Sequence, residues 1–236
     1  MAQILPWLLD DKPGMGPQMS NADAIKEKFL QSLDQSRIGT EPFRHWYLSD
    51  VFPEESCSAI KALPFDPPRI EDTEGKRETH NSTRTFFSVD WRRRFDVCRD
   101  MAEALQSKAT VRKLEQTCGT SLRGSFLRIE YCQDTDGFWL EPHTDIGAKL
   151  FTLLVYLSTN PESKNWGTDV LDEDMNIAAT IHYEFNCALI FIPAANTWHS
   201  FSKRPINGVR KTIIINYVKD EWRARQELAY PDQAVG

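Results

Sequence analysis

The sequence predicts a mostly β fold with flanking helices, built as a double-stranded β-helix (jelly-roll) core with N-terminal helices packed outside. Helix-like periodicity occurs in the first 120 residues, and short β-rich segments separated by turn residues follow from residue 121. These segments do not alternate with helices, which argues against a parallel sheet. Many antiparallel strands after a helical N-terminal third are typical of two packed antiparallel sheets.

The first 120 residues are expected to surround this core. Residues 1–20 are rich in Pro, Gly and Met and are expected to form a flexible arm or lid, and residues 21–120 to form helical support and loops. Ser20 can cap a first helix, and Pro53 suits the first turn of a second. We expect helices over residues 22–33, 53–63 and 95–114, a strand over 43–48 and a long loop over 64–82.

The jelly-roll core is expected over residues 121–218. Turn signals such as Asp136-Gly137 and Asn207-Gly208 separate its strands. The tail, residues 219–236, is expected to be a short exposed helix with a frayed end, and the whole chain to be a single domain. The predicted strands span residues 122–132, 150–157, 177–183, 188–192, 197–201 and 209–218.

Composition excludes several classes of protein. A net charge of -6 argues against a nucleic-acid binder, which usually carries a basic face. The five cysteines include no CxxC pair and indicate reduced thiols in a cytoplasmic protein. No apolar stretch approaches the roughly 20 residues of a membrane span, and the N-terminus lacks the basic start of a signal peptide. We therefore expect a soluble protein without a membrane or nucleic-acid partner, and its oligomeric state stays open.

His143, Asp145 and His199 are the candidate metal ligands. Residues two apart on a strand face the same side, so His143 and Asp145 can reach one ion. Two imidazoles and one carboxylate suit Fe(II) and leave coordination positions open. Each part is weak by itself, because a His-x-Asp triplet also occurs in surface loops and a lone histidine such as His199 is commonly a core residue. Zinc accepts the same ligand set, so a zinc hydrolase is an alternative.

Arg210 and Thr212 strengthen the iron interpretation, because the guanidinium is a permanent cation that binds carboxylates. If Asn207-Gly208 is the tip of a hairpin, His199 pairs with Asn216 and shares a face with Arg210 and Thr212. A tight hairpin would separate Arg210 from His199 by roughly 20 Å. We therefore expect residues 203–208 to be looped out and the pairing to slip by an even number. The residues expected on that face are His199, Phe201, Arg210, Thr212 and Ile214.

The C-terminal half resembles the Fe(II)/2-oxoglutarate-dependent oxygenases, especially the prolyl-hydroxylase-like branch. The matching segments occur in the family's order and cover about residues 122–218, whereas the first 120 residues carry no comparable signature. They are residues 127–131 (LRIEY), 137–145 (GFWLEPHTD), 152–157 (TLLVYL), 166–168 (WGT), 198–199 (WH) and 210–212 (RKT).

The resemblance implies that His143, Asp145 and His199 bind iron. It implies that Arg210 pairs with the far carboxylate of 2-oxoglutarate and that Thr212 supplies a nearby hydroxyl. Tyr131 and Tyr156 match tyrosines that commonly hydrogen-bond the cosubstrate, although core packing is an equal alternative for both. The cofactors implied are Fe(II), 2-oxoglutarate and O2, with release of succinate and CO2. A carboxylate at position 145 favours hydroxylation over halogenation, since halogenating relatives carry a small residue there.

Residues that would contact the substrate are less clearly marked. Arg84, Lys149 and Trp139 are the candidates, against the alternatives of a surface salt bridge for the two cations and packing for the tryptophan. If Arg84 and Lys149 face the iron, the substrate is expected to be an anionic small molecule.

The sequence therefore favours a 2-oxoglutarate-dependent dioxygenase that hydroxylates an unactivated carbon of a small molecule. Hydroxylation of a protein side chain, such as a prolyl residue, is the nearest alternative. A nucleic-acid demethylase of the same class is disfavoured by the acidic composition. A non-catalytic jelly-roll binding module with a vestigial site remains a different-class alternative.

Overall fold

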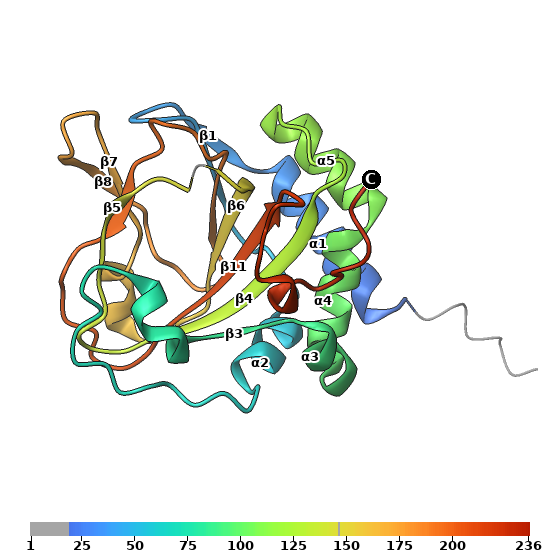
Figure 1. Ribbon diagram of the computed structural model, residues 1–236, viewed down its shortest axis with the longest axis horizontal. Coiled ribbons are helices and arrows are strands. Elements are labelled where there is room, and N and C mark those ends of the chain that lie inside the picture. Colours follow the sequence, from blue (N-terminus) through green and yellow to red (C-terminus); the bar gives the residue numbers. More distant parts are fainter. Residues whose placement is uncertain (1–18, 146) are drawn as a thin grey trace, which may run out of the picture.

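Two antiparallel sheets form the centre of the protein (Figure 1). The computed structural model describes residues 19–145 and 147–236, so the arm expected over residues 1–20 lies almost wholly outside the described residues. The large sheet has seven strands in the order β1-β2-β9-β6-β11-β4-β3, and the small sheet has four in the order β5-β10-β7-β8. This mostly β architecture with flanking helices is the predicted jelly-roll fold.

All strand pairs are antiparallel, and the strands are short apart from β4, β6 and β11. In chain order they are β1 (Arg37–Gly39), β2 (His45–Leu48), β3 (Arg84–Phe86), β4 (Phe126–Asp134), β5 (Leu140–His143), β6 (Lys149–Tyr156), β7 (Asp169–Leu171), β8 (Ile177–Thr180), β9 (Ala188–Phe191), β10 (His199–Phe201) and β11 (Arg210–Val218).

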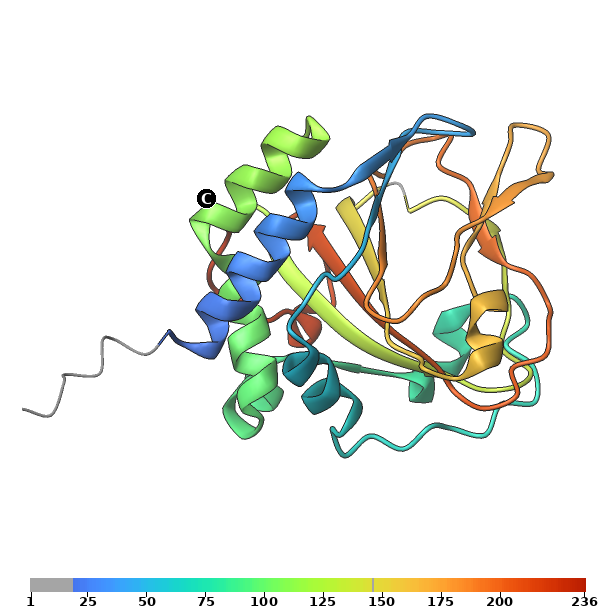
Figure 2. The same ribbon diagram turned by 180° about the vertical axis from the view of Figure 1, so that it is seen from behind.

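The helices lie against one face of the large sheet, and the small sheet lies on the other side (Figures 1 and 2). They are α1 (Asn21–Asp34), α2 (Glu54–Lys61), α3 (Val89–Arg94), α4 (Asp96–Gln106) and α5 (Lys108–Cys118). No helix in the described part of the chain has the length and apolar character needed to cross a membrane.

The helix ends follow local sequence signals. Ser20 caps α1 by accepting a hydrogen bond from the Asp23 amide (3.1 Å), and Ile25, Phe29 and Leu33 form its buried stripe. Gly119 ends α5 with a left-handed backbone (φ 69°), which glycine adopts without a Cβ clash.

The central strands β4 and β11 are buried on both faces, and their two faces differ in chemistry. Ile129, Tyr131, Ile213 and Ile215 pack in the apolar core that the large sheet shares with the helices. The alternate residues on β4 and β11 are largely polar and face the small sheet: Arg128, Glu130, Asp134, Arg210, Thr212 and Asn216. Buried polar side chains need partners, so this second face marks the position of a polar cavity.

Two expectations about the chain after residue 200 are wrong. β10 and β11 do not form a hairpin with each other, because β10 pairs with β5 and β7 in the small sheet and β11 with β4 and β6 in the large one.

The C-terminal segment is not a frayed tail either. Leu228 bridges to Arg128, the Ala229 amide donates to the Leu127 carbonyl, and both apolar side chains are buried. A free edge of β4 therefore orders this segment.

Candidate active site

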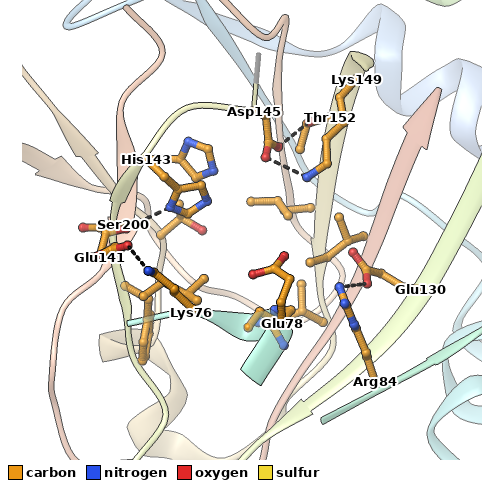
Figure 3. A pocket seen from close by; sticks show the side chains of 18 of the residues that line it. Lys76, Glu78, Arg84, Glu130, Glu141, His143, Asp145, Lys149, Thr152 and Ser200 are labelled. Carbon is orange, nitrogen blue, oxygen red and sulfur yellow. Dashed lines mark hydrogen bonds and ion pairs between the residues drawn. The ribbon is translucent and has the colours of Figure 1, made fainter. Parts of the chain in front are cut away.

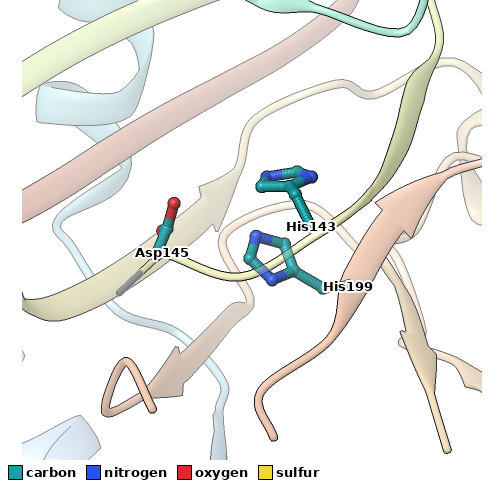
Figure 4. A group of neighbouring side chains, drawn as sticks. All are labelled: His143, Asp145 and His199. Carbon is teal, nitrogen blue, oxygen red and sulfur yellow. The ribbon is translucent and has the colours of Figure 1, made fainter. Parts of the chain in front are cut away.

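Three side chains from two strands and a loop converge at one end of the gap between the sheets (Figure 4). His143 is the last residue of β5, and His199, the first of β10, is its partner across the small sheet. Asp145 follows two residues after His143. Ligand atoms of the three residues all lie within 4.8 Å of one another, so the three residues form one candidate metal site.

Both imidazoles are oriented in the same way by the backbone. Nδ1 of His143 lies 2.8 Å from the Glu141 carbonyl, and Nδ1 of His199 lies 3.0 Å from the Thr197 carbonyl. A carbonyl can only accept, so each Nδ1 carries the proton and each Nε2 keeps a lone pair for a metal. Burial lowers the pKa of His199 to about 4, which keeps this imidazole neutral at neutral pH.

Asp145 is held by two residues of β6 (Figure 3). Lys149 Nζ donates to Oδ1 (2.6 Å), and Thr152 Oγ1 donates to Oδ2 (2.9 Å). Burial by itself would raise the pKa of Asp145, but the charge of Lys149 and the two imidazoles outweigh it and hold this pKa well below the usual range. The carboxylate is therefore ionised and its orientation is fixed.

Arg210 lies deeper in the same gap. Its Nε donates to the Trp166 carbonyl (2.8 Å), one terminal nitrogen donates to Asp134 (2.7 Å), and its guanidinium stacks on Phe201 (4.6 Å). Arg77 donates twice to the same carboxylate, at 2.7 and 3.2 Å. Two buried guanidiniums thus share one buried carboxylate, which leaves one positive charge without a counter-charge among the described residues.

Thr212 follows Arg210 on the same face of β11. Its hydroxyl is buried and has no hydrogen-bond partner among the described residues. A buried hydroxyl without a hydrogen-bond partner costs free energy, so an atom of a ligand is expected to form this hydrogen bond. Arg210 and Thr212 together fit the carboxylate of a cosubstrate, and the His-Asp-His set fits a ferrous ion.

A cavity of about 510 Å³ connects these groups. The metal-ligand candidates line it, as do Arg210 and Thr212. The expectation that His199, Phe201, Arg210, Thr212 and Ile214 face one way therefore agrees with their common place on the cavity wall, although the hairpin that suggested it does not exist. They meet across two facing sheets instead.

The two tyrosines are not placed alike. Tyr131 points to the opposite face of β4, into the core beside Phe65, and the structure does not bring it to the cavity. Its cosubstrate role is corrected on this ground, since alternate β4 residues face opposite sides. Tyr156 is on the cavity side of β6 but lies behind Thr168, to which its hydroxyl donates (3.0 Å). Burial raises the pKa of Tyr156 to about 12.

The substrate candidates also have partners within the protein. Arg84 and Lys149 both line the cavity, but Arg84 pairs with Glu130 (3.3 Å) and Lys149 with Asp145. Trp139 does not line the cavity. Its Nε1 donates to Asp72 (2.5 Å) and its backbone amide donates to the Thr73 hydroxyl oxygen (3.0 Å), so it anchors the segment at the cavity rim.

Several cavity residues were missed by reasoning from the sequence. The largest group lies on β4, where the polar positions 128, 130 and 134 alternate with Leu127, Ile129 and Tyr131. This alternation within a strand otherwise rich in apolar residues was a signal for a cavity wall. Arg77 and Glu78 gave no such signal because they begin a short 3-10 helix within the long segment expected to be a loop. The missed residues are Arg77, Glu78, Arg128, Glu130, Thr152, Thr168 and Ser200, which line the cavity, and Asp134, which pairs with Arg77.

The sequence matches no protein-family model and no curated protein. The structure is similar to that of a prolyl 4-hydroxylase from Phytophthora capsici, with 12% identity and a TM-score of 0.54 over 90% of this chain and 70% of that one. It is also similar to a prolyl hydroxylase from Trichoplax adhaerens solved with a hypoxia inducible factor peptide fragment, with 12% identity and a TM-score of 0.53 over 85% of this chain and 91% of that one. The chain therefore has the fold of the prolyl-hydroxylase-like Fe(II)/2-oxoglutarate oxygenases.

Proposed function

We propose that the protein is a non-haem Fe(II)- and 2-oxoglutarate-dependent dioxygenase that hydroxylates an unactivated carbon of a small molecule and releases succinate and CO2. One observation carries the proposal. The cavity that exposes the His143, Asp145 and His199 ligand atoms also contains the excess charge of Arg210 and the Thr212 hydroxyl, which has no partner in the described part of the chain.

Each residue has a role that follows from its contacts. His143, Asp145 and His199 would hold the iron, which supplies oxygen activation when bound. Lys149 and Thr152 orient the Asp145 carboxylate from β6. Arg210, fixed by Asp134 and the Trp166 carbonyl, would receive the far carboxylate of 2-oxoglutarate, with the Thr212 hydroxyl donating to it.

A zinc hydrolase explains less of the site. It would use the three metal ligands but would leave the Arg210 guanidinium without a function and the Thr212 hydroxyl without a partner among the described residues. A non-catalytic module would leave the whole set unexplained.

A small-molecule substrate fits the volume of the cavity, which lies within the range of about 300–1,000 Å³ usual for small-molecule sites. Hydroxylation of a protein side chain is the second candidate, and the likeness to a prolyl hydroxylase solved with a peptide fragment favours it. A set of proline-containing peptides assayed beside small metabolites distinguishes the two, because only the true class stimulates 2-oxoglutarate turnover.

Succinate formation tests the proposed chemistry. The purified chain is incubated with Fe(II) and 2-oxoglutarate under air, beside His199→Ala and the matched control His182→Ala, whose histidine is exposed and does not line the cavity. We expect succinate from the wild-type chain and the control but not from His199→Ala. Equal succinate from all three would exclude the assigned site, and none from any of them across the substrate set would contradict the oxygenase function.

A further inference from the structure

Ion pairs neutralise the lysines and arginines that face the cavity in the described part of the chain, apart from one charge shared by Arg77 and Arg210. Glu130 holds Arg84 (3.3 Å) and Arg128 (2.8 Å), and Arg128 also pairs with Glu227 (2.7 Å). All four side chains line the cavity, and those of Arg128 and Glu130 are almost fully buried. This group is neutral in total and offers no free cation to a substrate.

The remaining cations of the wall are similarly occupied. Lys149 pairs with Asp145 (2.6 Å), and Lys76 lies 3.9 Å from Glu141. Arg77 and Arg210 share the carboxylate of Asp134, so one positive charge is left over. We assign this charge to Arg210, which under the proposed function pairs with the carboxylate of the cosubstrate.

Glu78 is the exception among the described residues that line the cavity, because its carboxylate forms no ion pair or hydrogen bond with any of them. It lies on the 3-10 helix Arg77–Thr83. Figure 3 shows its side chain pointing into the cavity, between the side that carries His143 and Ser200 and the side that carries Arg84 and Glu130. The adjacent Arg77 cannot neutralise it, since both terminal nitrogens of Arg77 donate to Asp134.

The position of Glu78 is fixed by the segment that precedes it. Trp139 anchors the preceding segment through Asp72 and Thr73. Gly75 completes this anchor, because its positive φ (74°) and the tryptophan ring, 2.9 Å from where a Cβ would lie, both favour glycine. Arg77, the residue immediately before Glu78, is tied to buried Asp134. The carboxylate is therefore presented by an ordered rim segment.

We infer that Glu78 binds the cationic group, an ammonium or a guanidinium, of a small aliphatic substrate. The inference rests on the proposed function and gives the substrate class for the same cavity. It reverses the expectation of an anionic substrate, because Arg84 and Lys149, the cations behind that expectation, are already paired. With iron and cosubstrate in place, the carboxylate of Glu78 is the remaining charge on the described wall without a partner, and an ammonium or guanidinium supplies one.

Binding of matched pairs of probes tests this inference. Pentylamine is compared with pentan-1-ol, and butylguanidine with butylurea, so that each pair differs in charge at similar shape. The full chain with Fe(II) and 2-oxoglutarate is titrated under argon, and the dissociation constants are measured by calorimetry. We expect the cationic member of at least one pair to bind roughly tenfold more tightly to the wild-type chain, and to increase succinate formation once air is admitted.

Three variants locate the effect. Glu78→Gln is expected to bring the ratio of the two dissociation constants within each pair of probes to about one, and Glu78→Asp to keep part of the preference for the cationic probe. Glu71→Gln is expected to keep all of this preference, because Glu71 is exposed and does not line the cavity. No preference in the wild-type chain, or a preference that survives Glu78→Gln, overturns the inference. Succinate formed without any added amine reports on the proposed function alone, so its failure is separate from that of the Glu78 assignment.

Discussion

Arg77 and Arg210 both donate to the carboxylate of Asp134, each at 2.7 Å, and all three side chains are almost fully buried. Asp134 is the last residue of β4 and Arg210 the first of β11, and the two are partners across the sheet. Arg77 begins the 3-10 helix at the cavity rim. One carboxylate thus joins the large sheet, the rim segment and the guanidinium proposed to bind 2-oxoglutarate.

Asp134→Asn is expected to destabilise the protein by about 3–5 kcal/mol, because it leaves two buried guanidiniums without a counter-charge. Urea unfolding measures the loss. Asp232→Asn, at an exposed position without an ion pair among the described residues, is the control and should change the free energy of unfolding by less than about 0.5 kcal/mol. Similar stability for both variants would mean that Asp134 does not neutralise this pair.

Arg210→Ala is expected to raise the half-saturating concentration of 2-oxoglutarate by at least roughly tenfold, because a charge-assisted contact to the far carboxylate is lost. The half-saturating concentration of Fe(II) should change little, since Arg210 is not among the three clustered metal-ligand candidates. Both values come from succinate titrations. Loss of iron and cosubstrate binding to the same extent would contradict the assigned role.

Thr212→Val separates a ligand contact from a structural one. The hydroxyl of Thr212 has no partner among the described residues, so its replacement by an isosteric methyl should leave the unfolding temperature unchanged or raise it. The 2-oxoglutarate requirement should nevertheless increase. Thr110→Val is the matched contrast, since the Thr110 hydroxyl donates to the Ala104 carbonyl (2.7 Å) far from the cavity. It should lower stability and leave the 2-oxoglutarate requirement unchanged.

The ion pairs of Glu130 are expected to make the protein less stable at low pH. Burial raises its pKa, but Arg128, Arg84 and Arg77 outweigh burial and lower the pKa from 4.5 to about 2. Between these values the unfolded chain binds a proton at Glu130 that the folded chain does not, so the free energy of unfolding falls as the pH drops from about 4.5 towards 2. Urea unfolding at several pH values in this window should show a shallower slope for Glu130→Gln than for the wild-type chain. Parallel slopes would show that Glu130 is not responsible.

The elements that could be predicted are those set by local chemistry. The stripe of Ile25, Phe29 and Leu33 predicted α1 almost to its ends, and β-rich runs predicted β4, β6, β9 and β11 within a few residues. The three-residue strands β1 and β7 were missed, because so short a strand has no periodicity of its own and is ordered by its neighbours in the sheet. The segment of β3 was expected only as a strand or a loop.

What the sequence determined by itself is the chemistry of each position and the face of the strand on which it lies. The two-residue spacing of Arg210 with Thr212 is such a local fact. That of His143 with Asp145 pointed to candidate iron ligands, although Asp145 lies in the loop after β5 rather than on the strand. Only the tertiary structure decided which strands are neighbours. Pairing of β10 with β5 rather than β11 depends on how the sheets pack, a contact between residues distant in the chain that no local pattern specifies. The same packing placed Glu130 beside Arg84 and Asp134 between two arginines, and so decided which charges of the cavity are already matched and that Glu78 is not.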